Sequence, residues 1–125
     1  MRDGDAESLS SALTTCRRVF MDVADSVFPA RDEDWNDRKG RPRKVGTEEY
    51  KNRILAYLAG LNDSEGSYSL LESELEHVAG RLDNLYEKTC KGVHVDVTLD
   101  EAKLTVIHTY LFLGEIAMYT TNNKK

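Results

Sequence analysis

The stretch Cys-Lys-Gly-Val-His at residues 90–94 joins residue types that could do acid–base chemistry on a phosphate ester. An imidazole such as that of His94 gives or takes a proton near neutral pH, and the Lys91 ammonium could hold a phosphate nearby. The alternative is structural: His94 hydrogen-bonds a helix end, and Lys91 offsets the negative end of the helix dipole. The stretch therefore marks the first candidate site without deciding its role.

A second polar group lies in the predicted second helix, where Asn52 and Arg53 follow Tyr50. If that helix packs beside the end of the third, Asn52 and Arg53 could face His94 and bind the same ligand. Arg17 in the first helix is a less specific candidate for the same binding role. The alternative is that these side chains are solvated, as charged residues on helices usually are.

Neither a metal site nor a cofactor site is expected from the sequence. Cys16 and Cys90 stand alone inside or at the end of helical patterns, where a reduced thiol packs as a small apolar group. His77 and His108 have no carboxylate or cysteine at ligand spacing, so we expect both to be structural. Glycine-rich phosphate loops and nucleophile elbows are also missing from the sequence.

Four apolar stripes of alternating three- and four-residue steps predict the elements that position these residues. The predicted helices span about 8–28, 47–61, 69–91 and 99–120. Each stripe must be buried against the others, which predicts an all-α fold, a four-helix antiparallel bundle with a long loop between helices one and two. We expect residues 1–7 and 121–125 to fray.

The loop at 29–46 has no apolar period and holds an acidic half followed by the basic run 38–44. Such a run could contact a nucleic-acid backbone as a flexible arm, although a solvated loop is the favoured interpretation because acidic residues partly cancel it. Trp35 stands alone in the loop. It either pins the loop to the bundle or binds a ligand.

The fourth predicted helix is apolar most of the way round. A helix of this kind is either central to its bundle or buried in a dimer. We therefore expect a homodimer through helix four.

The bulk properties limit the class of protein. A chain of 125 residues with a formal net charge of -5 suits one domain, 1–125, and argues against a surface that generally coats nucleic acid. Without a signal peptide or eighteen apolar residues in a row, the sequence predicts a soluble, cytoplasmic protein with no membrane contact. The acidic start and charged tail would also suit a domain of a larger protein with additional domains.

Three stretches together resemble the HEPN (higher eukaryotes and prokaryotes nucleotide-binding) superfamily, particularly its helical domains in bacterial defence proteins. They are Cys-Arg-Arg-Val-Phe at 16–20, Val-Gly at 45–46 with Tyr-Lys-Asn-Arg at 50–53, and Lys-Gly-Val-His at 91–94. The resemblance spans most of the chain, from Leu9 to Tyr119. It implies a role in antiviral defence or regulation.

Active members of that superfamily resemble metal-independent ribonucleases, often dimers, in which an arginine and a histidine four to six residues later meet at the dimer cleft. His94 matches the histidine, whereas the window upstream holds Glu87, Lys88 and Thr89. Lys88 has the charge but not the forked geometry of arginine, and Arg81 lies too far upstream.

Two functions remain open from the sequence. The favoured one is a non-catalytic HEPN-like binding or dimerisation module, with RNA or a nucleotide as a candidate ligand. The alternative is a ribonuclease toxin with His94 as acid or base, helped by Lys88, Lys91 or Arg53.

Overall fold

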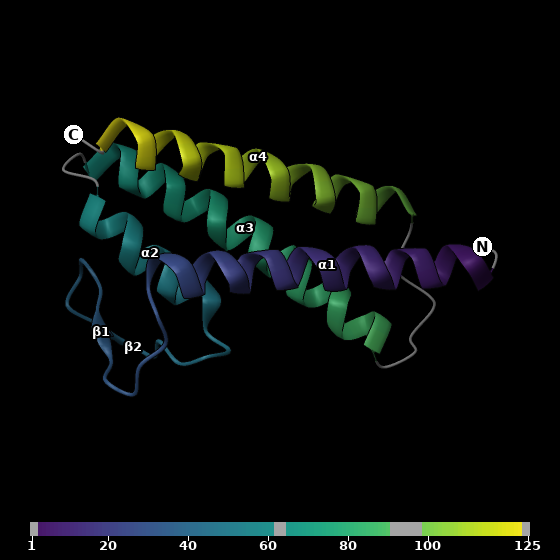
Figure 1. Ribbon diagram of the computed structural model, residues 1–125, viewed down its shortest axis with the longest axis horizontal. Helices are drawn as coiled ribbons and strands as arrows, with labels where there is room; N and C mark the ends of the chain where they lie inside the picture. The colour runs from purple at the N-terminus through teal and green to yellow at the C-terminus, as the bar shows by residue number, and fades with distance from the viewer. Residues whose placement is uncertain (1–2, 62–64, 91–98, 124–125) are drawn as a thin grey trace.

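Four helices and one short hairpin make up the computed structural model, which describes residues 3–61, 65–90 and 99–123 (Figure 1). The helices are α1 (Asp3–Val27), α2 (Tyr50–Leu61), α3 (Glu65–Cys90) and α4 (Leu99–Asn123). Strands β1 (Trp35–Asn36) and β2 (Pro42–Arg43) pair antiparallel, with Trp35 opposite Arg43. The predicted all-α four-helix bundle is confirmed.

Three predicted helix starts were wrong. The first helix begins at Asp3 and not near residue 8, so residues 3–7, which were expected to fray, are helical. The second helix was predicted to begin at about residue 47, but a turn at residues 47–48 comes first, and the Glu49 N–H closes it on the Gly46 carbonyl at 3.2 Å. The first helical bond then runs from the Arg53 N–H to the Glu49 carbonyl, so α2 begins at Tyr50. The third helix begins at Glu65, whose negative charge suits a helix N-terminus, and not near residue 69.

The apolar stripe predicted for the first helix lies in the hydrophobic core, between the other three helices. Leu13, Cys16 and Phe20 are buried, and the Phe20 ring stacks on Tyr50 of α2 at 5.5 Å between centroids. Phe20 also meets the Phe112 ring of α4 at 6.3 Å, so one side chain joins three helices. Aromatic pairs at these distances add to the stabilisation that burial alone gives.

Helix α3 is antiparallel to the other three helices (Figure 1). Tyr50, at the start of α2, donates a hydrogen bond to Asp83, late in α3, at 2.7 Å. Helices α1 and α2, by contrast, run the same way: Tyr50 lies beside Phe20, and Arg53, one turn on, lies beside Asp25 (Figure 1). The long connection 28–49 therefore has to bring the chain back along α1 before α2 starts.

A buried carboxylate organises this connection. Asp37 accepts backbone N–H groups of Lys39 and Arg41, both at 2.9 Å, and the Nε groups of Arg41 at 3.2 Å and Arg43 at 2.9 Å. These bonds, the Arg41 backbone bond foremost, hold the pKa of the Asp37 carboxyl well below its usual range. Gly40 has a φ of 78°, which the tight turn needs.

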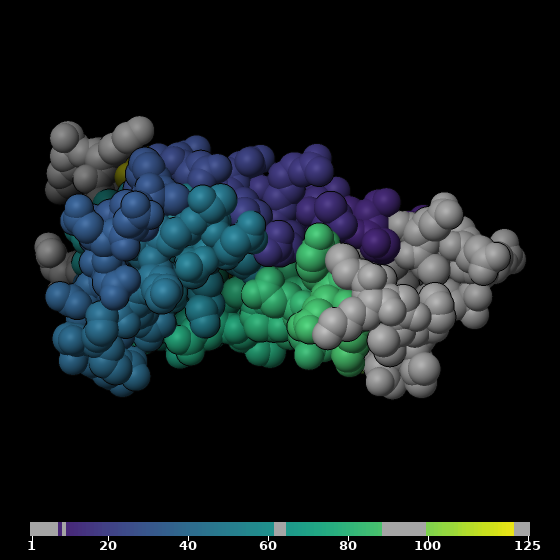
Figure 2. Space-filling view, turned by 90° about the horizontal axis from the view of Figure 1, so that it is seen from below, coloured from purple at the N-terminus to yellow at the C-terminus, as the bar shows by residue number. Residues whose placement is uncertain are grey.

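The basic run is mostly exposed, as expected for a solvated loop, but specific contacts order it. Besides the two arginines on Asp37, Arg38 pairs with Glu65 at 2.8 Å, donates to the Ala59 carbonyl at 3.0 Å and lies over the Tyr68 ring at 4.0 Å. Trp35 is half-buried against the core, which agrees with its pinning role. Figure 2 shows this hairpin segment beside α2 at one end of the molecule.

Arg53 ties the end of α1 to the entry of α2. Its side chain is 0% exposed, and Nη1 donates to the Asp25 carboxylate at 2.7 Å and to the Phe28 carbonyl at 3.4 Å. Nη2 donates to the Thr47 carbonyl at 2.9 Å. A fully buried charge is tolerated only with partners of this kind.

Removing this guanidinium should destabilise the bundle strongly. We expect Arg53→Ala to lower the free energy of unfolding by about 3 kcal/mol, because a cavity forms and two carbonyls lose their donors. Urea unfolding followed by circular dichroism measures it. The control is Arg18→Ala on the exposed side of α1, which should change stability by less than about 0.5 kcal/mol. Equal stability of the two variants would contradict the assigned role.

Candidate functional site

The predicted catalytic corner is only partly within the described chain. His94 and Lys91 lie outside the described residues. Lys88, the other residue that the HEPN resemblance implies for catalysis, lies in the last turn of α3. The geometry around Lys88 is therefore the part of this site that can be analysed.

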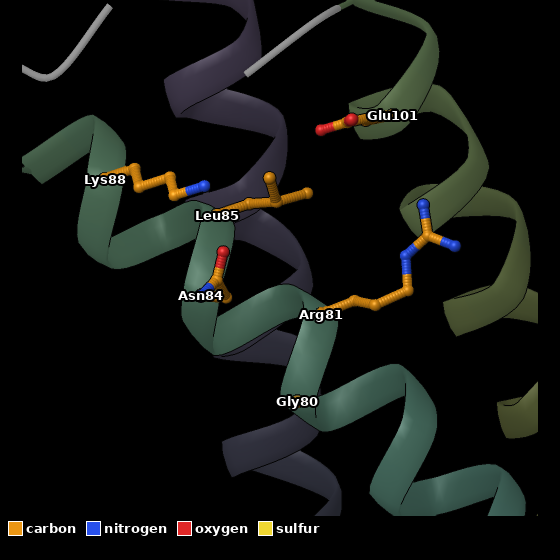
Figure 3. Close-up of a pocket in the computed structure, with 6 residues that line it drawn as sticks. All are labelled: Gly80, Arg81, Asn84, Leu85, Lys88 and Glu101. Atoms are coloured by element: carbon orange, nitrogen blue, oxygen red, sulfur yellow. The ribbon is translucent and has the colours of Figure 1, made fainter. Parts of the chain in front are cut away.

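Lys88 lines an open hollow of about 700 Å³ between the second half of α3 and the first turn of α4. The other lining residues are Gly80, Arg81, Asn84, Leu85 and Glu101. In Figure 3 the charged ends of Arg81 and Lys88 from α3 and of Glu101 from α4 are directed into this space. Its volume lies within the range of small-molecule sites.

Two cations in this hollow have no fixed partner. Arg81 and Lys88 are half-buried, and within the described ranges neither side chain makes a hydrogen bond or an ion pair. Arg17, Arg38, Arg43 and Arg53, by contrast, each pair with a carboxylate. Among its described lining residues, the hollow therefore presents two cations and one acid, Glu101, and could accept an anionic group.

The sequence analysis set Arg81 aside because only its distance along the chain from His94 was considered. Arg81 and Lys88 are seven positions apart on one helix. Since a helix turns about 100° per residue, seven positions return to nearly the same face about two turns later. That spacing was the available signal.

The other predicted binding residues lie elsewhere and have structural partners. The Asn52 amide donates to the Lys44 carbonyl at 2.9 Å, and Arg53 is enclosed as described above. Both hold the hairpin segment and the start of α2. Because Arg53 is fully buried, its guanidinium cannot reach a ligand without separation of α1 and α2.

Arg17 lies on a separate, smaller depression. It pairs with Glu48 at 3.0 Å and lies over the Tyr86 ring at 5.0 Å between its guanidinium carbon and the ring centroid. With Thr14, Arg18, Met21 and other α1 side chains it lines a space of about 360 Å³. The structure thus does not bring Arg17 or Arg53 into the hollow beside Lys88.

A groove of about 400 Å³ between α3 and α4 holds a titratable cluster that sequence reasoning did not find. The rings of His77 and His108 meet edge to face, with centroids 5.9 Å apart and an angle of 85°. Glu74 and Glu115 line the same groove, together with the apolar Val78, Leu111 and Phe112. We name Glu74, His77, His108 and Glu115 the groove cluster.

Within this cluster the Glu115 carboxyl is hydrogen-bonded to that of Glu74. Burial first, then the hydrogen bond and charge of Glu74, raise the pKa of Glu115 to about 7. The Glu115 carboxyl therefore keeps its proton up to about neutral pH.

Helix α4 carries apolar side chains on two opposite faces. The inner face, Ala102, Thr105, Thr109, Phe112 and Ile116, is buried. Thr105 and Thr109 donate their hydroxyls to the carbonyls of Glu101 at 2.9 Å and Thr105 at 2.8 Å, so neither hydroxyl is left unpaired in the core.

The opposite face remains in solvent. We define the outer stripe as Leu104, Ile107, Leu111, Gly114 and Met118, with Tyr110 beside it. The five large members are between 47% and 67% exposed. Of the two interpretations offered for this helix, a place at the centre of the bundle is excluded by this exposure.

Comparisons with known proteins do not identify the site, and the described residues offer no metal centre or membrane span. No protein family, curated protein or solved structure matches this chain. Across residues 3–61, 65–90 and 99–123, no three or more His, Cys, Asp or Glu side chains group so that they could hold a metal ion. In the same part of the chain, no helix has the length and apolar character that a membrane crossing requires.

Because the pKa of Glu115 is raised, the stability of the folded protein should depend on pH. Because the folded-state pKa of Glu115 lies above its ordinary 4.5, its contribution is complete below pH 4.5 and is lost as the pH rises through about 7. Glutamine imitates the protonated acid. We therefore expect Glu115→Gln to melt at a higher temperature than the wild type at pH 8.5, and at a similar temperature at pH 5, in dilute solution. A lower melting temperature of the variant at pH 8.5 would contradict the raised pKa of Glu115.

Proposed function

We propose that this chain is a helical self-association module, in which two copies pair through the outer stripe of α4. The observation that supports the proposal is the exposure of that stripe on a helix whose inner face already fills the core. Contiguous apolar surface of this extent is unusual on monomers and marks interaction sites.

The spacing of the stripe favours a second copy of the same helix as the partner. Its members step by three and four residues, the repeat by which helices pair in coiled coils. In an antiparallel pair centred on Leu111, Leu104 of one copy lies opposite Met118 of the other. Ile107, four positions before Leu111, then lies level with Glu115 and next to Gly114 of the other copy, and open space surrounds the missing side chain of Gly114.

The charge pattern supports the same partner. Between Leu104 and Met118 the only carboxylate or ammonium group is that of Glu115, and its pKa is raised. Interface cores are depleted of charged residues in this way. A two-fold contact uses the same patch on both copies, so one apolar helix face suffices to build it.

Within this proposal the chain serves as a non-catalytic, HEPN-like module of a bacterial defence or regulatory protein. Pairing would bring two copies of whatever the module binds or carries together. The described residues supply the pairing face without requiring a catalytic group.

A charge on the stripe should abolish pairing. We expect Leu111→Glu to remain monomeric at concentrations where the wild type dimerises, because pairing would bury two unpaired carboxylates at the centre of the interface. Sedimentation velocity over a concentration series measures the mass. Thr15→Glu, which adds the same charge to an exposed position of α1, should dimerise like the wild type. A monomeric wild type at all concentrations would disprove the proposal.

A second candidate function is the binding of RNA or a nucleotide at the hollow, and it is supported by Arg81 and Lys88. Their side chains have no partner within the described residues and face one open space. Arginine forms paired hydrogen bonds to phosphate, and lysine adds a point charge. The separation of about two helical turns suits a ligand with more than one phosphate.

Neutralising Arg81 should weaken this binding. We expect Arg81→Gln to bind a fluorescent single-stranded RNA about tenfold less tightly than the wild type, as the loss of a charge-assisted hydrogen bond would cause. The control Arg18→Gln should bind normally. Equal binding by all three proteins would exclude the hollow. Metal-free cleavage of the RNA by wild type, lost in His94→Ala, would favour the ribonuclease alternative.

A further inference from the structure

The groove cluster and the outer stripe share a side chain. Leu111 lines the groove between α3 and α4 and is also the central member of the stripe. Any partner seated on Leu111 therefore covers the mouth of the groove and removes water from the carboxyl pair beside it.

We propose that pairing of two copies through α4 is coupled to proton uptake by the Glu74–Glu115 pair of each copy, so that the assembly is favoured on the acidic side of neutrality. This inference rests on the proposed self-association. It goes beyond it by assigning a regulator, the proton, and the groups that bind it.

The physical reason is the cost of covering charge. Two carboxylates in contact repel, and losing water makes the charged forms less stable still. A singly protonated pair can keep its internal hydrogen bond and carries only one charge. The covered state therefore favours the protonated pair more than the open state does, and the dimer binds the proton more tightly than the monomer.

The sign of the effect follows from this difference. At pH values where the open monomer already holds this proton, pairing needs no uptake and is strongest. Above about pH 7 Glu115 of the monomer has lost its proton, so each copy must take up a proton when two copies pair. Each such proton weakens pairing by up to about tenfold per pH unit, and a dimer takes up two.

The other groups that face the pair come from the same two helices. His77 on α3 and His108 on α4 line the groove and contact each other edge to face. Ser73 is the remaining polar lining residue. A charged imidazole beside the pair would oppose its protonation, so the contribution of the histidines has to be separated by substitution.

The test is sedimentation equilibrium of the full chain at pH 6.5, 7.5 and 8.5 at constant ionic strength. We expect the wild-type dissociation constant to rise at least about tenfold from pH 6.5 to 8.5. Glu115→Gln, which keeps a neutral hydrogen-bonding group, should dimerise equally at all three values. Glu76→Gln removes an exposed carboxylate of α3 outside the groove and should keep the wild-type dependence. The double variant His77→Gln/His108→Gln should also keep it.

Each outcome decides the inference. A wild-type dimer that is insensitive to pH, or an unchanged pH dependence in Glu115→Gln, would overturn proton coupling and leave self-association standing. Loss of the dependence in the double histidine variant would assign it to the imidazoles and overturn it as well. Absence of any dimer in all variants at every pH would overturn both the coupling and the proposed function.

Discussion

Helix α4 has two apolar faces, and a single copy of the chain has room to bury one of them. Residues that differ by two positions, such as Ala102 and Leu104, point about 200° apart on a helix, so both faces cannot meet the same neighbours. The inner face fills the core against Phe20 of α1 and the apolar side of α3. Everything proposed about assembly follows from the face that remains.

The charged residues of the chain divide into those that hold the fold and those that remain available. Asp37 and Arg53 are buried and hydrogen-bonded to charged partners, and they fix the path of the chain between α1 and α2. Arg38 ties the same segment to α3. Against this background, two arrangements stand apart: Arg81 and Lys88 have no partner within the described residues, and the pKa of Glu115 is raised.

The sequence allowed the helices and their buried faces to be predicted, because a stripe such as Leu13, Cys16 and Phe20 is a local pattern with a single physical interpretation. It did not allow the contacts between helices to be predicted. Tyr50 and Asp83, or His77 and His108, are far apart in the chain, and spacing within one helix carries no information on the partner helix. The hairpin was missed for a different reason: composition indicated a solvated loop, whereas one acid, Asp37, collects the neighbouring basic groups.

The brevity of α2 shapes the molecule as a whole. It has 12 residues, while α1, α3 and α4 have 25, 26 and 25. Tyr50, its first residue, meets Asp83, so the last turns of α3 extend past the point where α2 begins (Figure 1). All four helices therefore lie side by side at the hairpin end of the bundle, whereas only α1, α3 and α4 continue to the other end. Arg81 and Lys88 belong to this second half of α3, beyond the residues that contact the start of α2 or just at their level, and both line the hollow beside the start of α4.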